Sequence, residues 1–333
     1  MTNTSDITFV CCVESGSLES QTIRMIESLR RYGGKFSTAP VVAVTPRFGP
    51  PLSRKTCQIL DRYEVEHLVL RSDIGNTRYS WNHFMNKPHA ILAVDDRSKS
   101  EAIGWLDSDL LFIGEAEQLN LRADESFLAC TTDSSGGTTG LTDPMEPYWL
   151  SACKALNLDI ELLPWVTTEK GQVRIRYYFN SGMFIYRRET SFANQYLKNC
   201  TKILDAYISS KVCGFFYTDQ VALGLTAFQL SLSWRSLALS HNFTMTPKEH
   251  KIFYMEELFK EARIVHYHGA MWPASWPVFL ECFCNTHPEV GEWLASLGPM
   301  SNSAPWQWRL LSKLLKTVRS RTENTYNRNC QIV

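Results

Sequence analysis

The stretch AIGWLDSDLLFI, residues 102–113, decides how the rest of the sequence is interpreted. Its first five residues form a continuous apolar run, as is typical of a strand that is buried on both faces. Asp107 and Asp109 follow directly, at the carboxyl end of that strand, where ligands collect in open α/β sheets. Because residues two apart in an extended chain point to the same side, we expect both carboxylates to face one ligand.

Two neighbouring carboxylates repel each other unless a cation lies between them. A hard divalent ion with oxygen ligands, Mn²⁺ or Mg²⁺, fits this pair and commonly bridges to phosphates. A solvated turn or a helix cap is the structural alternative, but either would normally end the apolar run, which here resumes at once with Leu110. We therefore favour a metal site at Asp107 and Asp109.

Apolar runs alternate with helical patterns on both sides of this stretch. Strands separated by helices imply right-handed crossovers and a mostly parallel central sheet flanked by helices, which is an α/β fold. The sequence shows no domain boundary before about residue 290, so we expect one domain over residues 1–290 and a helical tail over residues 291–333. The predicted strands are residues 7–13, 40–44, 66–70, 102–106 and 127–131, and the predicted helices are residues 20–32, 56–62 and 86–95.

The chain is less regular after residue 131. A tight turn is predicted at residues 180–182, an Asn-Ser-Gly sequence, and Thr218 is the predicted N-cap of the helix that follows it. The glycine-rich segment 134–140 is interpreted as either a mobile lid or an inert connector. The further predicted strands are residues 174–178, 183–186 and 264–268, and the further predicted helices are residues 194–210 and 219–227.

His266 and His268 flank Tyr267 and would share one face of an extended segment. A neutral imidazole is a common ligand for Mn²⁺ and for other transition metals. A lone histidine beside an apolar strand is more often a core residue with its hydrogen bonds satisfied. A pair of histidines followed by a glycine favours a loop that approaches a ligand, and a mixed Asp/His site would favour Mn²⁺ over Mg²⁺.

Four segments, WLDSDLLF, YYFNSGMFIYRR, TDQVALGL and VHYHG, stand in this order between about residues 86 and 276. Together they resemble the nucleotide-sugar glycosyltransferases of the GT-A fold. The resemblance is nearest to the retaining group that includes glycogenin and bacterial lipopolysaccharide galactosyl- and glucosyltransferases. It implies a single Rossmann-like GT-A domain that moves a sugar from a nucleotide-diphospho-sugar donor to a hydroxyl acceptor.

The resemblance also implies roles for residues of this chain. Asp107, Asp109 and His266 would hold Mn²⁺, or Mg²⁺, on the diphosphate of the donor. Asp219 and Gln220 would lie beneath the donor sugar as catalytic residues. Two further residues are placed by their motifs: Asn180 would line the sugar and acceptor pocket, and Gly269, which closes the H-x-x-G motif, would lie in the donor site.

One departure from the family concerns the lysine that binds the diphosphate. The family usually has Lys-Pro-Trp after the H-x-x-G motif, whereas this chain has Met271-Trp272-Pro273. Lys87 or Arg78 would then have to supply the positive charge. The stereochemical outcome is left open between retention and inversion.

Composition excludes other classes. With 34 Lys and Arg against 34 Asp and Glu, the formal net charge is zero, which argues against a protein that binds nucleic acid by neutralising phosphates. The sequence has no run of about 18 apolar residues, so it predicts no transmembrane helix. Several of the ten cysteines lie inside apolar runs, so we expect free buried thiols and a reducing, cytoplasmic compartment.

The C-terminal segment WQWRLLSKLLKTVRSR, residues 306–321, holds five basic residues and no acidic one. Trp308, Leu311, Leu315 and Val318 fall on one helical face, so the segment is a basic amphipathic helix. Such a helix either docks on its own domain or binds an anionic membrane. Residues 305–321 are therefore a candidate contact with the inner face of a membrane, and the sequence predicts no oligomeric state.

Two other functions remain as alternatives. A sugar nucleotidyltransferase on a similar sheet would need a basic, glycine-rich phosphate loop after the first strand, but residues 14–19 hold no Lys or Arg. A non-catalytic scaffold that keeps the fold and binds a sugar or a partner protein is the second alternative. Asp133, at the end of a predicted strand, would either contact the donor sugar or cap a turn.

Overall fold

A seven-stranded sheet runs through the centre of the protein in a computed structural model that describes residues 6–70, 79–248, 251–302 and 304–333. Arg78 therefore lies outside the described residues. Six of the seven strands are parallel to one another and β9 runs in the opposite direction, which confirms a mostly parallel sheet. In sheet order the strands are β11 (Trp234–Ser236), β6 (Phe127–Cys130), β9 (Asn180–Arg187), β4 (Ala102–Leu106), β1 (Ile7–Cys12), β2 (Val41–Thr45) and β3 (Val65–Val69).

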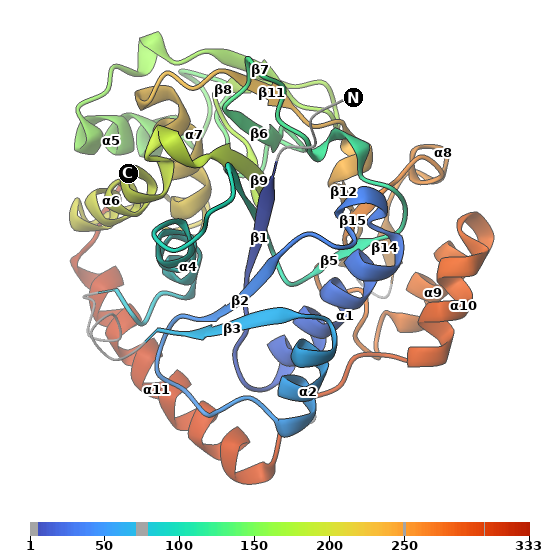
Figure 1. Cartoon of the computed structure of the whole chain (residues 1–333). Helices are drawn as coiled ribbons and strands as arrows, with labels where there is room; N and C mark the ends of the chain where they lie inside the picture. Colours follow the sequence, from blue (N-terminus) through green and yellow to red (C-terminus); the bar gives the residue numbers. More distant parts are fainter. Residues whose placement is uncertain (1–5, 71–78, 249–250, 303) are drawn as a thin grey trace.

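Helices cover both faces of this sheet, as predicted (Figure 1). The reason is that the side chains of β1 (Ile7–Cys12) point alternately to the two faces and are apolar on both. Phe9 and Cys11 belong to a core shared with the first helices of the chain, whereas Val10 and Cys12 belong to a second core on the opposite face. One face carries α1 (Ser17–Tyr32) and α2 (Arg54–Arg62), and the other carries α4 (Asn86–Asp95), α5 (Glu146–Leu156), α6 (Phe192–Asp205) and α7 (Thr218–Gln229).

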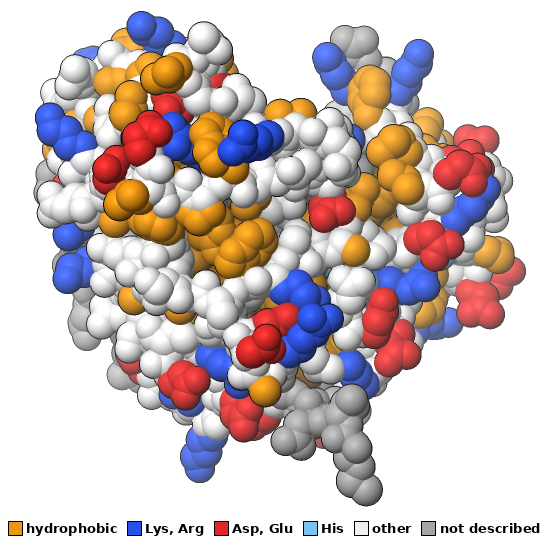
Figure 2. Space-filling model, turned by 90° about the horizontal axis from the view of Figure 1, so that it is seen from above, with side chains coloured by type: hydrophobic (Ala, Val, Ile, Leu, Met, Phe, Trp, Pro, Cys, Tyr) orange, Lys and Arg blue, Asp and Glu red, His pale blue; other side chains and the backbone are white. Residues whose placement is uncertain are grey.

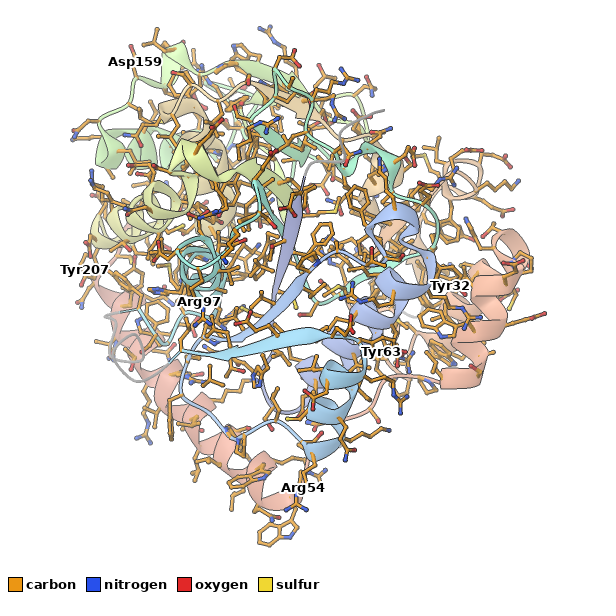
Figure 3. All side chains as sticks on the ribbon, in the orientation of Figure 1. Tyr32, Arg54, Tyr63, Arg97, Asp159 and Tyr207 are labelled. Atoms are coloured by element: carbon orange, nitrogen blue, oxygen red, sulfur yellow. The ribbon has the colours of Figure 1, made fainter. Side chains whose placement is uncertain are left out.

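A smaller three-stranded sheet extends the molecule beside α1. It is built from β5 (Leu110–Phe112), β12 (Phe243–Thr244) and β15 (Ile264–His266), and a third apolar core lies around it. Tyr32 at the end of α1 faces this part of the molecule (Figure 3), and its ring centroid lies 5.5 Å from that of Trp293. The helices here are α8 (Glu256–Phe259), α9 (Trp276–Thr286) and α10 (Pro288–Leu297), so residues 290 and 291 lie within one helix.

The C-terminal helix α11 (Trp306–Asn329) lies against the rest of the protein through one side. Tyr326 is buried, and its hydroxyl donates to the carbonyl of Leu204 over 2.8 Å. The last strand, β16 (Gln331–Ile332), then pairs in parallel with β10 (Ile208–Ser209). The remaining short strands form two antiparallel pairs, β7 (Trp165–Thr167) with β8 (Arg174–Arg176), and β13 (Thr246–Lys248) with β14 (Lys251–Phe253).

Several local predictions were wrong. The predicted turn at residues 180–182 is the start of β9, and the predicted strand 174–178 ends at Arg176 as β8, which pairs with β7. The predicted helix 194–210 ends at Asp205, because the chain turns there to form β10. The glycine-rich segment contacts α5, where Trp149 Nε1 donates to the carbonyl of Gly136 over 3.0 Å, and both interpretations of this segment stay predictions.

The surface charges agree with the balanced composition, and the cysteines agree with the expectation of free thiols. Figure 2 shows Lys and Arg side chains interspersed with Asp and Glu side chains over the face that it presents. All ten cysteines are free, and six of them are buried. Within the described part of the chain, none of the helices has the length and apolar character needed to cross a bilayer.

Candidate active site

The Asp107-Ser108-Asp109 segment forms a turn between β4 and β5. The expectation of an extended segment was therefore wrong, although the consequence for the two carboxylates is the same. Ser108 points inward, where its hydroxyl donates to the carbonyl of Cys12 over 2.8 Å, and it is buried. Asp107 and Asp109, on either side of it, both line one cavity.

The pairing of β5 with β15 places a histidine beside Asp109. The two strands are antiparallel, with His266 opposite Leu110. His266 Nε2 lies 3.2 Å from Asp109 Oδ1, and His268 Nδ1 lies 3.8 Å from Asp109 Oδ2. The two imidazole rings stack with their centroids 4.1 Å apart. One ligand atom from each of these three side chains lies within 4.8 Å of the others, a spacing at which they can share one metal ion.

Close packing against β9 fixes the imidazole of His266. A Cβ atom added at Gly182 would lie 2.5 Å from His266 Cε1, which is closer than non-bonded atoms approach. His266 Nδ1 is buried and has no hydrogen-bond partner among the described residues. Close packing therefore orients this ring, a task that a second hydrogen bond usually performs for a metal-binding histidine. His268 has a φ of 49°, in the left-handed region that side chains other than glycine adopt infrequently.

Asp107 belongs to a different arrangement, centred on a buried lysine. Lys87 Nζ lies 3.5 Å from Asp107 Oδ1 and 3.1 Å from Asp219 Oδ2. It also donates to the carbonyl and the hydroxyl of Ser181 over 2.7 and 2.8 Å. Trp105 Nε1 donates to Asp107 Oδ1 over 2.7 Å. Lys87 therefore joins strands β4 and β9 to helix α7 beneath the cavity.

These contacts shift the acid–base behaviour of the five groups in different directions. Burial lowers the pKa of Lys87, but two neighbouring carboxylates outweigh it and raise this pKa overall. Burial raises the pKa of Asp107 in spite of the lysine beside it. Burial also opposes ionisation of Asp109, but the imidazole of His266 outweighs it, so the pKa of Asp109 is lowered and that of His266 is raised. Burial, followed by the charge of His266, lowers the pKa of His268 to about 4.

Asn180 reaches the cavity through an irregularity in the sheet. The register between β6 and β9 shifts between Ala129 and Cys130, and Asn180 lies opposite Cys130. Such a bulge re-aims the side chain beside it. The Oδ1 atom of Asn180 accepts from the backbone N–H of Gly182 over 2.9 Å and from Asn242 Nδ2 over 2.8 Å. Its Nδ2 group makes no hydrogen bond with the residues that the structure describes, and Asn180 lines the cavity.

Asp219 and Gln220 open helix α7, and both are buried beside β9. Gln220 Oε1 accepts from the backbone N–H and the hydroxyl of Ser181, each over 3.1 Å, and its Nε2 donates to the hydroxyl of Tyr178. Both ends of the amide are thus engaged. The prediction that Thr218 caps this helix was wrong, because Tyr217 is the N-cap and the Thr218 hydroxyl donates to the carbonyl of Phe215.

One cavity of about 1180 Å³ collects these groups. It is lined by seven of the eight site residues that the sequence indicated, namely Lys87, Asp107, Asp109, Asn180, Asp219, Gln220 and His266. Gly269 does not line it, and the side chains nearest to that glycine are those of Pro247 and Trp272. Asp133 lines the cavity and also accepts from the backbone N–H of Ser135 in a turn.

Sequence reasoning missed several lining residues. Ser181 lies within the quoted FNSG motif and joins Lys87 to Gln220, but it was not selected. Glu14 follows β1, and Arg47 follows β2, and their side chains form an ion pair of 2.6 Å within the cavity wall. A further part of the wall comes from α11, which no local pattern connects with the sheet.

The residues around Asp109 fit a divalent cation. One carboxylate and two imidazoles form a mixed oxygen and nitrogen donor set, which suits Mn²⁺ and similar transition metals better than Mg²⁺. Asp107 lies close enough for its charge to favour protonated His266, so a second carboxylate adjoins the set. The same cavity has space for a large organic ligand beside the ion.

A comparison with family models identifies residues 9–231 as a Rhodobacterales glycosyltransferase domain. No curated protein matches the chain by sequence. The matched residues include Lys87, Asp107, Asp109, Asn180 and the start of α7, whereas the two histidines and α11 lie beyond them.

Solved structures of glycosyltransferases have a similar fold. The apo structure of WbbM, a bifunctional glycosyltransferase, is 14% identical over 88% of this chain and 52% of WbbM, with a TM-score of 0.51, so the chain spans about half of that protein. An active-site mutant of LgtC is 11% identical over 91% of this chain and 99% of LgtC, with a TM-score of 0.51. The galactosyltransferase LgtC in complex with donor and acceptor sugar analogs gives the same coverage and a TM-score of 0.50.

Proposed function

The chain belongs to the Rhodobacterales glycosyltransferase family, and from this premise we propose that it is a metal-dependent enzyme that uses a nucleotide-diphospho-sugar donor and a hydroxyl acceptor. The proposal for the two substrates is supported by LgtC, whose structure holds donor and acceptor sugar analogs. The observation that carries the metal proposal is the Asp109, His266 and His268 cluster, which opens into the same cavity as Lys87 and Asp219.

Asp109, His266 and His268 are the residues that would hold the ion, with Asp107 beside them. When bound, a divalent cation neutralises the charge that develops on the departing diphosphate. His268 extends the three-residue set that the resemblance implies. Its low pKa keeps the imidazole neutral near pH 7, the form in which histidine binds metals.

The residues of α7 and β9 would act on the sugar. Glycosyl transfer passes through an oxocarbenium-like centre, which a nearby carboxylate stabilises. Asp219 supplies that carboxylate, and its ion pair with Lys87 holds it in place. The amide of Gln220 is fixed at both ends by Ser181 and Tyr178, so it offers a rigid surface beneath the sugar. Asn180 Nδ2 remains to donate to a sugar hydroxyl.

The direct test is a screen of nucleotide sugars for Mn²⁺-stimulated hydrolysis of the donor. The Asp109→Asn variant should lose at least about 100-fold of the stimulated rate, since it removes the charged ligand from the cluster. Asp124→Asn is the matched control, because Asp124 is exposed and lies outside the cavity. Full activity of Asp109→Asn would reject the metal assignment.

The same screen separates the two alternatives. A scaffold would bind a nucleoside diphosphate with Mn²⁺ and hydrolyse no donor. A nucleotidyltransferase would form a nucleotide sugar from a sugar phosphate and a nucleoside triphosphate. The end of β1 offers it little support, since Arg47 is already paired with Glu14, and Lys87 with Asp107 and Asp219.

We further propose that the outer side of α11 binds the inner, cytoplasmic face of a membrane. The sequence placed Trp308, Leu311, Leu315 and Val318 on the apolar face. The structure half-buries the first three, whereas Val318 is exposed, so the prediction was wrong for that residue. A second apolar row faces outward, and exposed Arg309, Lys313 and Arg321 lie near it on the helix. The exposed fractions in this row are 70% for Trp306, 52% for Leu310, 57% for Leu314 and 60% for Val318. An apolar row with basic neighbours suits anionic lipid.

Flotation with phosphatidylglycerol vesicles tests this proposal. A Leu310→Ser/Leu314→Ser variant should bind about tenfold more weakly than the wild-type protein, because it removes apolar area from the row. Leu141→Ser/Leu162→Ser is the control, since these two leucines are even more exposed but lie elsewhere. Unchanged binding of the α11 variant, or absence of binding by the wild-type protein, would overturn the proposal.

A further inference from the structure

Helix α11 forms part of the cavity wall, although it lies 75 or more residues beyond the residues that match the family model. Figure 1 shows it running along the edge of the molecule, outside the layer formed by α4 and past the strands β2 and β3. Its contribution to the wall consists of Ser312, Leu315, Lys316, Arg319, Ser320 and Glu323.

The position of α11 is fixed from three sides. Arg319 Nη2 donates to the carbonyl of Phe48 over 2.6 Å, which ties the helix to the segment after β2. Near the other end, the buried ring of Tyr326 lies 5.0 Å from that of Trp81. The pairing of β16 with β10 then holds the chain after the helix. The inward side of α11 is therefore a built part of the cavity.

Only some of the basic side chains in the cavity wall form ion pairs with carboxylates. Arg47 is paired with Glu14 through two contacts of 2.6 and 3.0 Å, and Lys87 is paired with Asp107 and Asp219. The other two Lys and Arg residues of the wall are Lys316 and Arg319, and neither forms an ion pair with any residue that the structure describes. Both come from α11.

The surroundings of Arg319 favour an anion. This guanidinium is half-buried, and burial together with the positive charge of Arg47 lowers its pKa, although the carboxylate of Glu14 acts in the opposite direction. An anion between two such cations would relieve their repulsion. Arg47 and Glu14 follow β2 and β1 directly, and the carboxyl ends of parallel strands are where nucleotides bind in α/β sheets. Guanidinium and ammonium groups in that place are suited to phosphate oxygens.

We propose that α11 closes the donor site and that Lys316 and Arg319 bind the diphosphate of the nucleotide. This inference rests on the proposed function, since it concerns the same cavity. It assigns the C-terminal helix a part in substrate binding: its inner side holds cations toward the phosphates, while its outer side is free for other contacts.

Calorimetric titration with UDP, GDP, ADP and CDP, each in the presence of Mn²⁺, tests the inference. For the diphosphate that the wild-type protein binds most tightly, the Lys316→Gln/Arg319→Gln variant should bind at least about 30-fold more weakly, because two charge-assisted contacts are lost. The matched control is Lys313→Gln/Arg321→Gln, which removes the same charge from exposed positions of the same helix. This control should change the affinity less than about twofold, because exposed charges outside the site are screened by salt.

Two further measurements keep the test decisive. The corresponding uncharged nucleoside should bind the wild type and the double variant equally, because it carries no phosphate. Lys316→Gln alone should also weaken diphosphate binding, and this exposed side chain makes no hydrogen bond within the described residues whose loss would unfold the protein. Equal diphosphate affinity in wild type and double variant, or an equal loss in the control, would overturn the inference.

Failure of the inference and failure of the proposed function give different results. If the wild-type protein binds a nucleoside diphosphate and Asp109→Asn does not, while the double variant binds like wild type, only the role of α11 is wrong. If the wild-type protein binds none of the four diphosphates, both the proposed donor site and the proposed role of α11 are wrong.

Discussion

The side chains of Asp107 and Asp109 come from the same turn, but they contact different groups in two halves of the cavity. Asp107 faces Lys87, a buried cation that the chain itself supplies and that also pairs with Asp219. Asp109 faces His266 and His268, two imidazoles that can bind a metal ion in their neutral form. The lysine half, Lys87 with Asp107 and Asp219, therefore contains its own cation, whereas the histidine half, Asp109 with His266 and His268, can take up a metal cation.

The comparison shows that two carboxylates in one motif can have different roles, one in stability and the other in metal binding. In the lysine half, the cation joins three elements of the fold, so its removal should affect stability. In the histidine half, the ring of His266 is positioned by packing against Gly182, so small changes there should affect metal affinity with little effect on stability.

The largest expected effect follows from Lys87→Met. This change keeps most of the side-chain volume but leaves two carboxylates and the carbonyl of Ser181 without their cationic partner. The free energy of unfolding should fall by about 3–5 kcal/mol, as is typical when one member of a buried ion pair is removed. Urea denaturation measures this value.

The control for this experiment is Lys99→Met, which changes an exposed lysine and should shift the free energy of unfolding by less than about 0.5 kcal/mol. His268→Ala should likewise leave stability nearly unchanged. If Lys87→Met and Lys99→Met proved equally stable, the lysine half would not be a structural element.

A smaller effect is expected from Gly182→Ala. The new methyl group would meet the ring of His266 and displace it from Asp109. Affinity for Mn²⁺ in the absence of nucleotide should fall by about tenfold, as is common when a residue that orients a metal ligand is changed. Gly49→Ala is a suitable control, since nothing lies within 4 Å of a Cβ atom added there. Equal Mn²⁺ affinities in the two variants would show that His266 does not depend on this packing.

The smallest effect concerns pH and a third histidine. His241 is fully buried and precedes Asn242, the residue that donates to Asn180. Its Nε2 accepts from the backbone N–H of Gln118 over 3.3 Å, so the ring is neutral, and burial, outweighing the partly exposed Glu117, lowers its pKa to about 4. His266 has its pKa raised instead, because the half-buried carboxylate of Asp109 outweighs the lowering effect of burial.

The sign of the effect follows from proton binding. Between pH 6.5 and about 4, unfolded His241 binds a proton that the folded protein does not, so stability falls as the pH falls through this range. Between pH 7 and 5.5 this residue should contribute a loss of about 1 kcal/mol. Comparing the pH dependence of unfolding in wild type and His241→Gln isolates the contribution. An identical pH dependence in the two proteins would show that His241 is not held neutral.

Much of the fold could be predicted from the sequence, because buried parallel strands appear as continuous apolar runs. The runs around Val10, Val42 and Trp105 each gave a strand of the central sheet at nearly the right bounds. The pairing of β9 could not be predicted in this way. Asn-Ser-Gly is typical of a turn, but its neighbours β4 and β6 hold the segment extended, and a bulge there aims Asn180 at the cavity.

The site itself was predictable where one motif carries it and not where distant segments meet. Asp109 and His266 were both selected from local patterns, but their contact depends on the pairing of β5 with β15, which are more than 150 residues apart. The same holds for α11, whose amphipathic pattern predicts a helix without indicating which surface it covers. Lys316 and Arg319 reach the cavity because distant contacts hold the helix there, namely the bond from Arg319 to the carbonyl of Phe48, the buried Tyr326 and the pairing of β16.

Electron paramagnetic resonance of Mn²⁺ tests the central claim most directly, since the signal of the free ion is lost when the ion binds. Titration of the protein without nucleotide should show about one bound ion per chain for wild type and for the control Asp124→Asn. The Asp109→Asn variant, checked for folding by circular dichroism, should bind at least about 30-fold more weakly. Equal binding by Asp109→Asn and wild type would contradict the assignment of Asp109, His266 and His268 as a metal site.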